Sequence, residues 1–283
     1  MAHLLSFLIH LFLGQLVGQV TRRNMLLPPG TSLHNRYVIA KVHEQGQESA
    51  VYLAYDEAED RDVAIKENTH ADQAHCRQFE LEATMLSNLS HPSIPRALDY
   101  FIEDRVQFLV MDFLEGFNLQ QVVQRRQPAT PEILDWAAQL CDILTFLHSL
   151  RPSVVHGDVE PANLILGQDG QIFLVDFGAA QVYAPGSGGT MTAAGMRTAQ
   201  VTDPRDDQYC VAATLYALFT GAQRRLSQQW FAEGPALPSI RAVRPDLSPY
   251  AEQAIFRALS LHPGRRYHDV REFKAALGCG AGR

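Results

Sequence analysis

The chain has 283 residues, of which 46% are hydrophobic and 19% are charged. This length supports one large domain or two lobes with an apolar core, and the composition excludes a disordered chain. The formal net charge of -7 gives no electrostatic footprint for nucleic acid, so we predict no nucleic-acid partner.

The first 25 residues form an apolar N-terminal segment. Residues 4–20 are interrupted by His10 and two glutamines, and as a helix they span about 25 Å, less than a ~30 Å hydrocarbon core. Three interpretations stay open: a weak membrane anchor, an amphipathic or packing helix, and an extension from a misplaced start codon. Arg22 and Arg23 follow, so an anchor would leave the rest of the chain on the cytoplasmic side.

A mostly β lobe with one helix is predicted for residues 37–113. Residues 26–36 are interpreted as a linker. Alternating apolar residues between turn signals predict antiparallel strands at 37–42, 50–56, 62–67, 96–104 and 106–113. A helix is predicted at about 71–89, ending before His91-Pro92.

A larger, mainly helical lobe is predicted for residues 114–278, followed by a tail at 279–283. Apolar residues at i, i+3 and i+4 indicate a helix at 131–150, with Thr130 as its N-cap. Further helices are predicted at 207–220, 248–259 and 270–277, and short strands at 163–166 and 172–175. The fold class is therefore α+β with two lobes.

Four cysteines are far apart and show no C-x-x-C spacing. They are Cys76, Cys141, Cys210 and Cys279. Such spacing favours neither disulfides nor a cysteine zinc site, and it fits a reducing, cytoplasmic location.

Five polar residues occur in an order typical of phosphoryl transfer. They are Lys66, Glu82, Asp158, Asn163 and Asp176. That reaction needs cations on the phosphates, ligands for magnesium and a base for the acceptor hydroxyl. Each residue alone has an ordinary alternative, a solvated lysine or a turn or capping residue. Their common order and spacing favour the functional interpretation.

With these residues the chain resembles a eukaryotic-type (Hanks-type) Ser/Thr protein kinase of the bacterial kind, over about residues 27–277. "LVMDFLEGFNL" resembles the hinge, with Met111 at the gatekeeper position. "DPRDDQYCVAATLYALFTG" resembles the helix that anchors the larger lobe, through Asp207. "LHPGRRY" matches the closing P-x-x-R motif through Pro263 and Arg266.

The resemblance implies a bilobal fold, ATP, Mg²⁺ (with Mn²⁺ as an alternative ion) and an unknown protein substrate. It implies that Lys66 holds the α- and β-phosphates, that Glu82 positions Lys66, and that Asp158 is the catalytic base. Asn163 and Asp176 would hold the metal. The other residues expected at the nucleotide are Gly46, Val51, Ala64, Asp112, Leu114 and Ile165. Leu86, His156 and Phe177 would stack as a structural spine.

Four departures from the family pattern affect activity. The three glycine positions of the phosphate loop hold Glu44, Gly46 and Ser49. Gly157 replaces the arginine that reads a phosphorylated loop, so control through Thr190, Thr192 or Thr198 is not expected. Glu160 replaces the lysine near the γ-phosphate. The A-P-E motif is missing, with Arg197 at its glutamate position, which predicts loss of the ion pair to Arg266.

Three functions remain open from the sequence. The first is an ATP-dependent Ser/Thr protein kinase of low activity. The second is a pseudokinase that binds nucleotide or acts as a scaffold. The third is a small-molecule phosphotransferase, because "HGDVEPANLIL" is also similar to the corresponding loop of aminoglycoside kinases. The hinge and the P-x-x-R motif favour the protein kinases.

Overall fold

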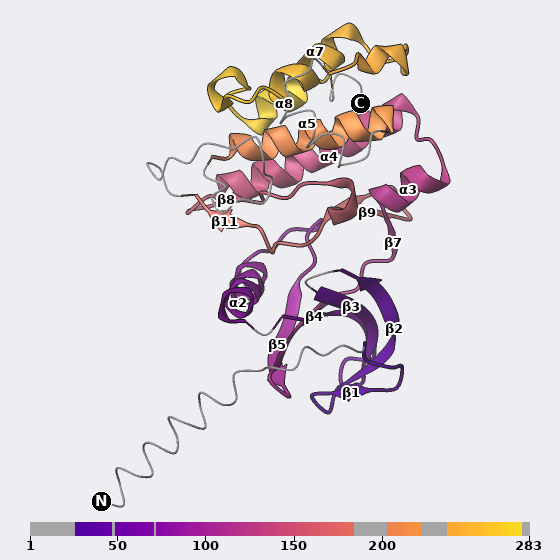
Figure 1. Ribbon diagram of the computed structural model, residues 1–283, viewed down its shortest axis with the longest axis vertical. Coiled ribbons are helices and arrows are strands. Elements are labelled where there is room, and N and C mark those ends of the chain that lie inside the picture. Colours follow the sequence, from indigo (N-terminus) through magenta and orange to yellow (C-terminus); the bar gives the residue numbers. More distant parts are fainter. Residues whose placement is uncertain (1–25, 47–48, 71, 184–202, 222–236, 279–283) are drawn as a thin grey trace, which may run out of the picture. The chain divides into compact units, whose positions relative to one another are not determined.

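The computed structural model describes residues 26–46, 49–70, 72–183, 203–221 and 237–278, and Figure 1 labels most of their helices and strands. The described residues divide into two compact units: 26–87 with 96–113, and 88–95 with 114–278. The first is a β-sheet with one helix and the second is mainly helical, so the predicted α+β kinase-like architecture is confirmed. The predictions for residues 4–20, 190–198 and 279–283 lie outside the described residues.

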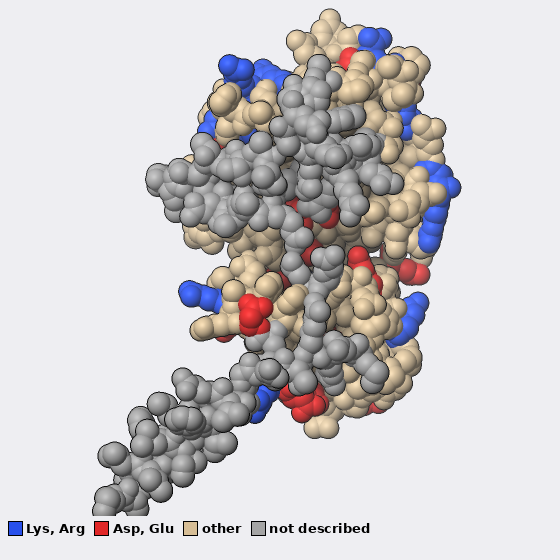
Figure 2. Space-filling view, viewed as in Figure 1, with Lys and Arg blue, Asp and Glu red and all other residues tan. Residues whose placement is uncertain are grey.

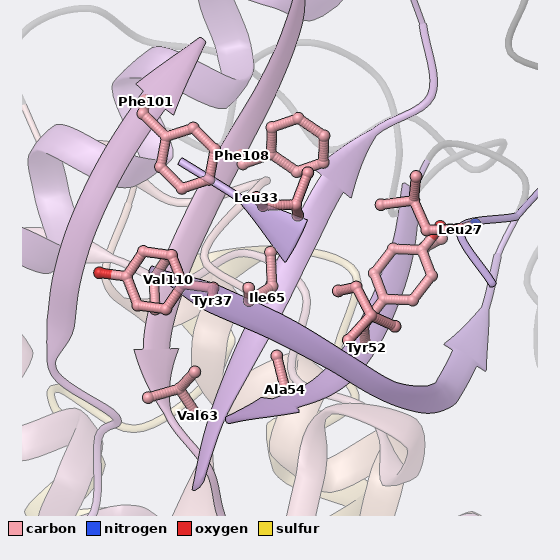
Figure 3. Close-up of a cluster of buried hydrophobic side chains, with 12 residues drawn as sticks. Leu27, Leu33, Tyr37, Tyr52, Ala54, Val63, Ile65, Phe101, Phe108 and Val110 are labelled. Atoms are coloured by element: carbon pink, nitrogen blue, oxygen red, sulfur yellow. The ribbon is translucent and has the colours of Figure 1, made fainter. Parts of the chain in front are cut away.

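The first unit contains a six-stranded antiparallel sheet in the order β1-β2-β3-β4-β6-β5. Its strands are β1 (Ser32–Leu33), β2 (Tyr37–Gln45), β3 (Ser49–Asp56), β4 (Arg61–Asn68), β5 (Ala97–Glu103) and β6 (Val106–Asp112). Alternation along β4 separates two faces, because successive side chains of a strand point to opposite sides. Val63 and Ile65 enter the core cluster drawn in Figure 3. Ala64 and Lys66 therefore project from the other face.

The segment predicted as a linker, residues 26–36, instead belongs to this sheet and its core. β1 pairs with β2, and Leu27 and Leu33 are both 3% exposed. Figure 3 shows Leu27 beside Tyr52, whose hydroxyl oxygen accepts a hydrogen bond from the Leu27 N–H at 3.3 Å. The Pro-Pro-Gly turn resembles a linker in sequence, but it reverses the chain so that both leucines reach the core.

Helix α2 (Gln73–Ser87) packs on the sheet through Phe79, Ala83 and Leu86. Asp72 caps its N-terminus, since its Oδ1 accepts from the N–H groups of Ala74 at 3.2 Å and His75 at 3.1 Å. The helix ends two residues before the predicted Leu89. Residues 88–95, predicted in the first lobe, belong to the second unit, where the Ser93 carbonyl accepts from the Leu174 N–H at 3.0 Å.

The second unit is built around α4 and α5. Its helices are α3 (Leu119–Arg125), α4 (Thr130–Ser149), α5 (Arg205–Thr220), α7 (Pro249–Ala258) and α8 (Val270–Ala276), with one-turn helices η1 (Pro161–Asn163), η2 (Ile240–Ala242) and η3 (Pro263–Arg265). α5 contacts α4, α7 and α8, which explains why almost all its residues are buried. α4 begins at Thr130, so its N-cap is Ala129 and not the predicted Thr130.

Short strands carry the polar residues of this unit. β7 (Gly116–Asn118), β9 (Leu164–Gly167) and β10 (Ile172–Leu174) form one small sheet, and β8 (Val154–Val155) pairs with β11 (Gln181–Val182). Only glycine fits at position 116, because an added Cβ would lie 2.3 Å from the Leu166 carbonyl oxygen. β7, β8 and β11 are too short to leave an alternating pattern, and none of them was predicted.

Figure 2 shows Lys and Arg in separate small groups on the visible face and not in one continuous patch. Among the described residues, no helix has the length and apolar character needed to cross a membrane.

Candidate active site

A lysine and a glutamate form a buried pair in the first unit. Lys66 lies on β4 and Glu82 on α2. The Lys66 Nζ lies 2.7 Å from Oε1 and 2.9 Å from Oε2 of Glu82. The two residues are 8% and 4% exposed. Because a buried charge that loses its partner is costly, this pair holds α2 in one orientation on the sheet.

Val51 and Ala64 share the sheet face of Lys66. In the antiparallel register Val51 lies opposite Lys66, and Ala64 lies opposite Met111. Directly opposed residues project to the same face, so this face presents apolar side chains next to the lysine. The structure thus brings together three of the residues that the sequence predicts at the nucleotide.

Gly46 directly follows β2, at the start of the connection to β3. Its N–H donates to the Ser49 carbonyl at 2.9 Å. Its φ is outside the left-handed region, and an added Cβ would come no closer than 3.4 Å to that oxygen. Glycine is therefore not required here for conformation. Glu44, opposite Val51 in the register, is exposed to solvent.

The Asp112 carboxylate is occupied by a neighbouring arginine. Arg96 Nε lies 2.8 Å from Oδ2, and Arg96 Nη2 lies 2.9 Å from Oδ1. Burial alone would raise the pKa of Asp112, but the hydrogen bonds from Arg96 hold this pKa below its ordinary value. The expected contact of Asp112 with a nucleotide would therefore use its backbone and not this carboxylate. Leu114, also predicted there, is half-buried in the second unit.

Asp158 and Asn163 share one hydrogen-bond network in the second unit. The Asn163 Nδ2 donates to the Asp158 carbonyl oxygen at 2.8 Å and to its Oδ2 at 3.1 Å. Asn163 belongs to the one-turn helix η1, and its own N–H donates to the Glu160 carbonyl at 2.9 Å. These bonds orient the amide, so that Oδ1 is directed away from Asp158 as an acceptor for another group.

Asp207 of α5 anchors this loop through the backbone. Its Oδ2 accepts from the His156 N–H at 3.0 Å, and its Oδ1 accepts from the Gly157 N–H at 2.8 Å. The His148 Nε2 lies 2.7 Å from Oδ2. Burial alone would raise the pKa of Asp207, but the His148 hydrogen bond and neighbouring groups hold it below the ordinary value. Thr214 of the same helix donates to the Val159 carbonyl at 3.0 Å.

His156 has a structural place in the loop. It is fully buried, and burial lowers the pKa of its imidazole. The Asp158 N–H lies 3.3 Å from Nδ1, which identifies this nitrogen as the acceptor of a neutral ring. The ring meets Phe177 edge-on, with centroids 4.8 Å apart. His156 therefore supports the backbone of Asp158.

Asp176 follows β10 and has a left-handed backbone with φ of 61°. Its Oδ1 accepts from the Gly178 N–H at 3.2 Å. The preceding N–H, of Val175, donates to the Asn163 carbonyl at 3.0 Å, which ties Asp176 to the loop of Asn163. Backbone strain of this kind concentrates at functional sites. Ile165, also expected at the nucleotide, lies on β9 between its strand partners Asn118 and Phe173.

Arg266 keeps an acidic partner that the sequence did not reveal. The A-P-E position, residue 197, lies outside the described residues, but Arg266 Nη1 lies 2.9 Å from Oδ1 of Asp206. Its guanidinium also donates to three carbonyl groups, and its side chain is fully buried. The predicted loss of the ion pair between Arg266 and an A-P-E glutamate concerns position 197 and stays a prediction, but Asp206 gives Arg266 a different acidic partner. Asp206 and Arg266 are 60 residues apart, and no local pattern predicts their contact.

Comparisons with known proteins agree with this geometry. A family model described as "Protein kinase domain" matches residues 38–223. The chain is similar to serine/threonine-protein kinase PknB of Mycolicibacterium smegmatis, with 29% identity over 271 residues, 87% of this chain and 43% of that protein. It is also similar to serine/threonine-protein kinase PknL of Mycobacterium tuberculosis, with 31% identity over 263 residues, 87% of this chain and 65% of that protein. The chain thus spans less than half the length of PknB.

A solved structure titled "PpkA-294 apo form" has the same fold. Its TM-score is 0.69 at 20% identity, and the match covers 89% of this chain and 99% of that chain. The family model, the relatives and the fold point in one direction: the chain belongs to the protein kinase family.

Proposed function

We propose that this chain is an ATP-dependent Ser/Thr protein kinase that transfers the γ-phosphate slowly to a protein hydroxyl. The observation that carries the proposal is the network of Asp158 and Asn163, in which the amide donates to the backbone and carboxylate of the aspartate. A catalytic base and a metal ligand of a kinase loop require this kind of fixed relationship. The buried Lys66–Glu82 pair supports the same conclusion.

The donor set of the second unit fits a magnesium ion. Mg²⁺ prefers oxygen ligands, and the Nδ2 bonds of Asn163 leave its Oδ1 for that role. Asp176 is linked to the same loop, because the N–H of the preceding residue, Val175, donates to the Asn163 carbonyl oxygen. When bound, Mg²⁺ neutralises charge on the transferred phosphoryl group. Asn163 and Asp176 would hold this ion, and Mn²⁺ uses the same ligands.

Asp158 would act as the base of the transfer. In the reaction, a bond forms between the acceptor hydroxyl oxygen and the γ-phosphorus, and the bond from that phosphorus to the β,γ-bridging oxygen breaks to release ADP. The hydroxyl proton passes to the Asp158 carboxylate. Lys66, held by Glu82, would bind the α- and β-phosphates, and the backbone of Gly46 would approach the phosphates. Val51, Ala64 and Ile165 would contact the adenine, together with the backbone of Asp112 and Leu114.

Glu160 is the main reason to propose a slow reaction. A unit charge at about 4 Å in an effective dielectric near 20 is worth about 4 kcal/mol. Exchanging a lysine for a glutamate near the γ-phosphate reverses that contribution, and even a fraction of it lowers the rate more than tenfold. Glu160 is half-buried in the loop, so water screens its charge only in part.

A pseudokinase is the second candidate function. Glu44 lies at a glycine position of the phosphate loop and Glu160 at the lysine position of the catalytic loop. Both place negative charge where phosphates are expected. In this candidate the chain binds a nucleotide or a partner protein and signals without turnover.

ADP release by the purified full chain separates these functions. The assay contains ATP and Mg²⁺ with a Ser/Thr peptide mixture, with an aminoglycoside, or with no acceptor. We expect release that depends on the peptides and is lost in Asp158→Ala, whereas a nucleotide-induced thermal shift persists in both proteins.

Two results would exclude the kinase. A thermal shift with nucleotide but no ADP release under any condition would identify a pseudokinase. Release that depends on the aminoglycoside alone would identify a small-molecule phosphotransferase.

A further inference from the structure

Three potential metal ligands converge at the start of α2. They are His70, Asp72 and His75, and one ligand atom from each lies within 4.8 Å of the others. The cluster occupies the connection between β4 and α2 and the first turn of the helix. None of its residues has a part in the phosphoryl transfer proposed above. Among the described residues it is the one group of this kind.

The local structure already holds these three side chains in contact. The two oxygens of the Asp72 carboxylate make different contacts. Oδ1 caps the helix, and Oδ2 lies 2.5 Å from the His75 Nδ1. The imidazoles of His70 and His75 stack with centroids 4.3 Å apart and planes 17° apart. Backbone contacts fix His70, because its N–H donates to the Asn68 Oδ1 at 3.0 Å and its carbonyl accepts from the Cys76 thiol at 3.8 Å.

We propose that His70, Asp72 and His75 bind a Zn²⁺ ion. Two imidazoles and a carboxylate are typical zinc ligands, with bonds of about 2.0–2.2 Å, and a tetrahedral ion with three protein ligands keeps one position for water. Ligand atoms about 3.4 Å apart satisfy this geometry. The three ligand atoms lie within 4.8 Å of one another, so the side chains would rotate to reach this spacing when the ion binds. The negative charge of Asp72 and the partial exposure of both histidines favour entry of a dication.

The site would join the β4–α2 connection to the helix that carries Glu82. His75 and Glu82 are seven residues apart on α2, which is about two helical turns, so they lie on the same side of the helix. Zinc would therefore fix the first turn of α2 to the loop after β4, the strand of Lys66. This inference concerns metal binding and does not depend on catalysis.

Zinc binding to the untagged full chain tests the proposal. The metal-free protein is titrated with ZnCl₂ in competition with a chromogenic chelator, next to His70→Ala, His75→Ala and the double variant. Asp72 is retained in all of them, so that the helix cap is kept. We expect each variant to lose one bound equivalent of Zn²⁺, and Zn²⁺ to raise the Tm of the wild type more than that of the double variant.

A second helix start provides the matched control. Asp269 caps α8 in the same way, through the Glu272 N–H at 2.9 Å, and the His268 Nδ1 lies 3.8 Å from its carboxylate. Among the described residues, no third potential metal ligand joins His268 and Asp269. His268→Ala should therefore bind as much Zn²⁺ as the wild type. Circular dichroism without metal verifies that each variant folds.

The proposal fails if the double variant, folded by this criterion, binds the same number of equivalents with the same affinity as the wild type. It also fails if His268→Ala loses the same equivalent as His75→Ala. In either case His70, Asp72 and His75 serve the helix cap and its ion pair alone.

Discussion

The two units hold their proposed catalytic groups in different ways. In the first unit, Lys66 is held by a side-chain pair between β4 and α2, the contact with Glu82. In the second, the loop of Asp158 is held by its backbone, because Asp207 accepts two successive N–H groups of that loop. A backbone anchor tolerates changes of side chain along the loop, whereas a side-chain pair does not. This difference explains how Gly157 and Glu160 can depart from the family pattern without displacing Asp158.

Removal of Asp207 should have the largest effect, because it breaks the backbone anchor. Asp207→Ala leaves the N–H groups of His156 and Gly157 buried without their acceptor. We expect the free energy of unfolding to fall by about 3–5 kcal/mol, measured by urea denaturation. Asp142→Ala is the control, since its carboxylate is 65% exposed in a surface pair with Lys274, and it should change stability little.

The effect of Asp207→Ala should also depend on pH. The pKa of Asp207 is lower in the folded chain than its ordinary value, so the unfolded chain binds the proton more tightly. The stabilisation is complete above the ordinary carboxyl pKa of about 3.9 and is lost as pH falls through the lower folded value. The wild type and variant should thus converge in stability below about pH 4. A constant difference down to pH 2 would contradict the anchor.

Loss of the Lys66–Glu82 pair, which lies in the first unit, should reduce turnover. Glu82→Gln removes the charge that holds Lys66, and we expect ADP release to fall about 100-fold, equivalent to about 2.7 kcal/mol in activation free energy. Glu80→Gln, on the exposed side of the same helix, is the control and should keep wild-type turnover. Equal rates for both variants would show that the pair is not needed to position Lys66.

A charge change in the loop should alter the rate without altering the anchor. Glu160→Lys restores a cation near the γ-phosphate, and we expect turnover to rise more than tenfold, which is at least about 1.4 kcal/mol. Glu160→Gln should lie between the two. The Glu160 carbonyl that accepts from Asn163 belongs to the backbone, so urea midpoints should stay within error. A slower Glu160→Lys enzyme would contradict the assigned place of this side chain.

The smallest effect is expected at Gly157. Its φ of 77° lies in the left-handed region, where a Cβ costs about 1–2 kcal/mol. Gly157→Ala should therefore lower the free energy of unfolding by about that amount. Gly264→Ala is the control, because position 264 has no positive φ and open space for a Cβ. If both variants are equally stable, the backbone of the loop relaxes more easily than the anchor implies.

Much of this arrangement could be predicted from the sequence because its signals are local. Alternation in the strand of Lys66 and the stripe of α4 specify their elements within a few residues. Asp158, Asn163 and Asp176 lie next to short apolar stretches, so the pattern of apolar residues predicts that they flank short strands. Contacts between distant residues left no such signal: Asp206 meets Arg266 across 60 positions, and His148 meets Asp207 across 59. The sequence predicts a linker at Leu27 because a Pro-Pro-Gly turn conceals the burial of this residue.

Transfer of labelled γ-phosphate to a protein hydroxyl tests the central claim most directly. The wild type and Asp158→Asn are compared with Mg²⁺ and γ-labelled ATP on the same Ser/Thr peptide mixture, after urea midpoints show that both fold. The account predicts labelled phosphoserine or phosphothreonine with the wild type, and a rate at least about 100-fold lower with Asp158→Asn at similar nucleotide affinity. Equal labelling by both proteins, or none by a wild type that binds nucleotide, would contradict it.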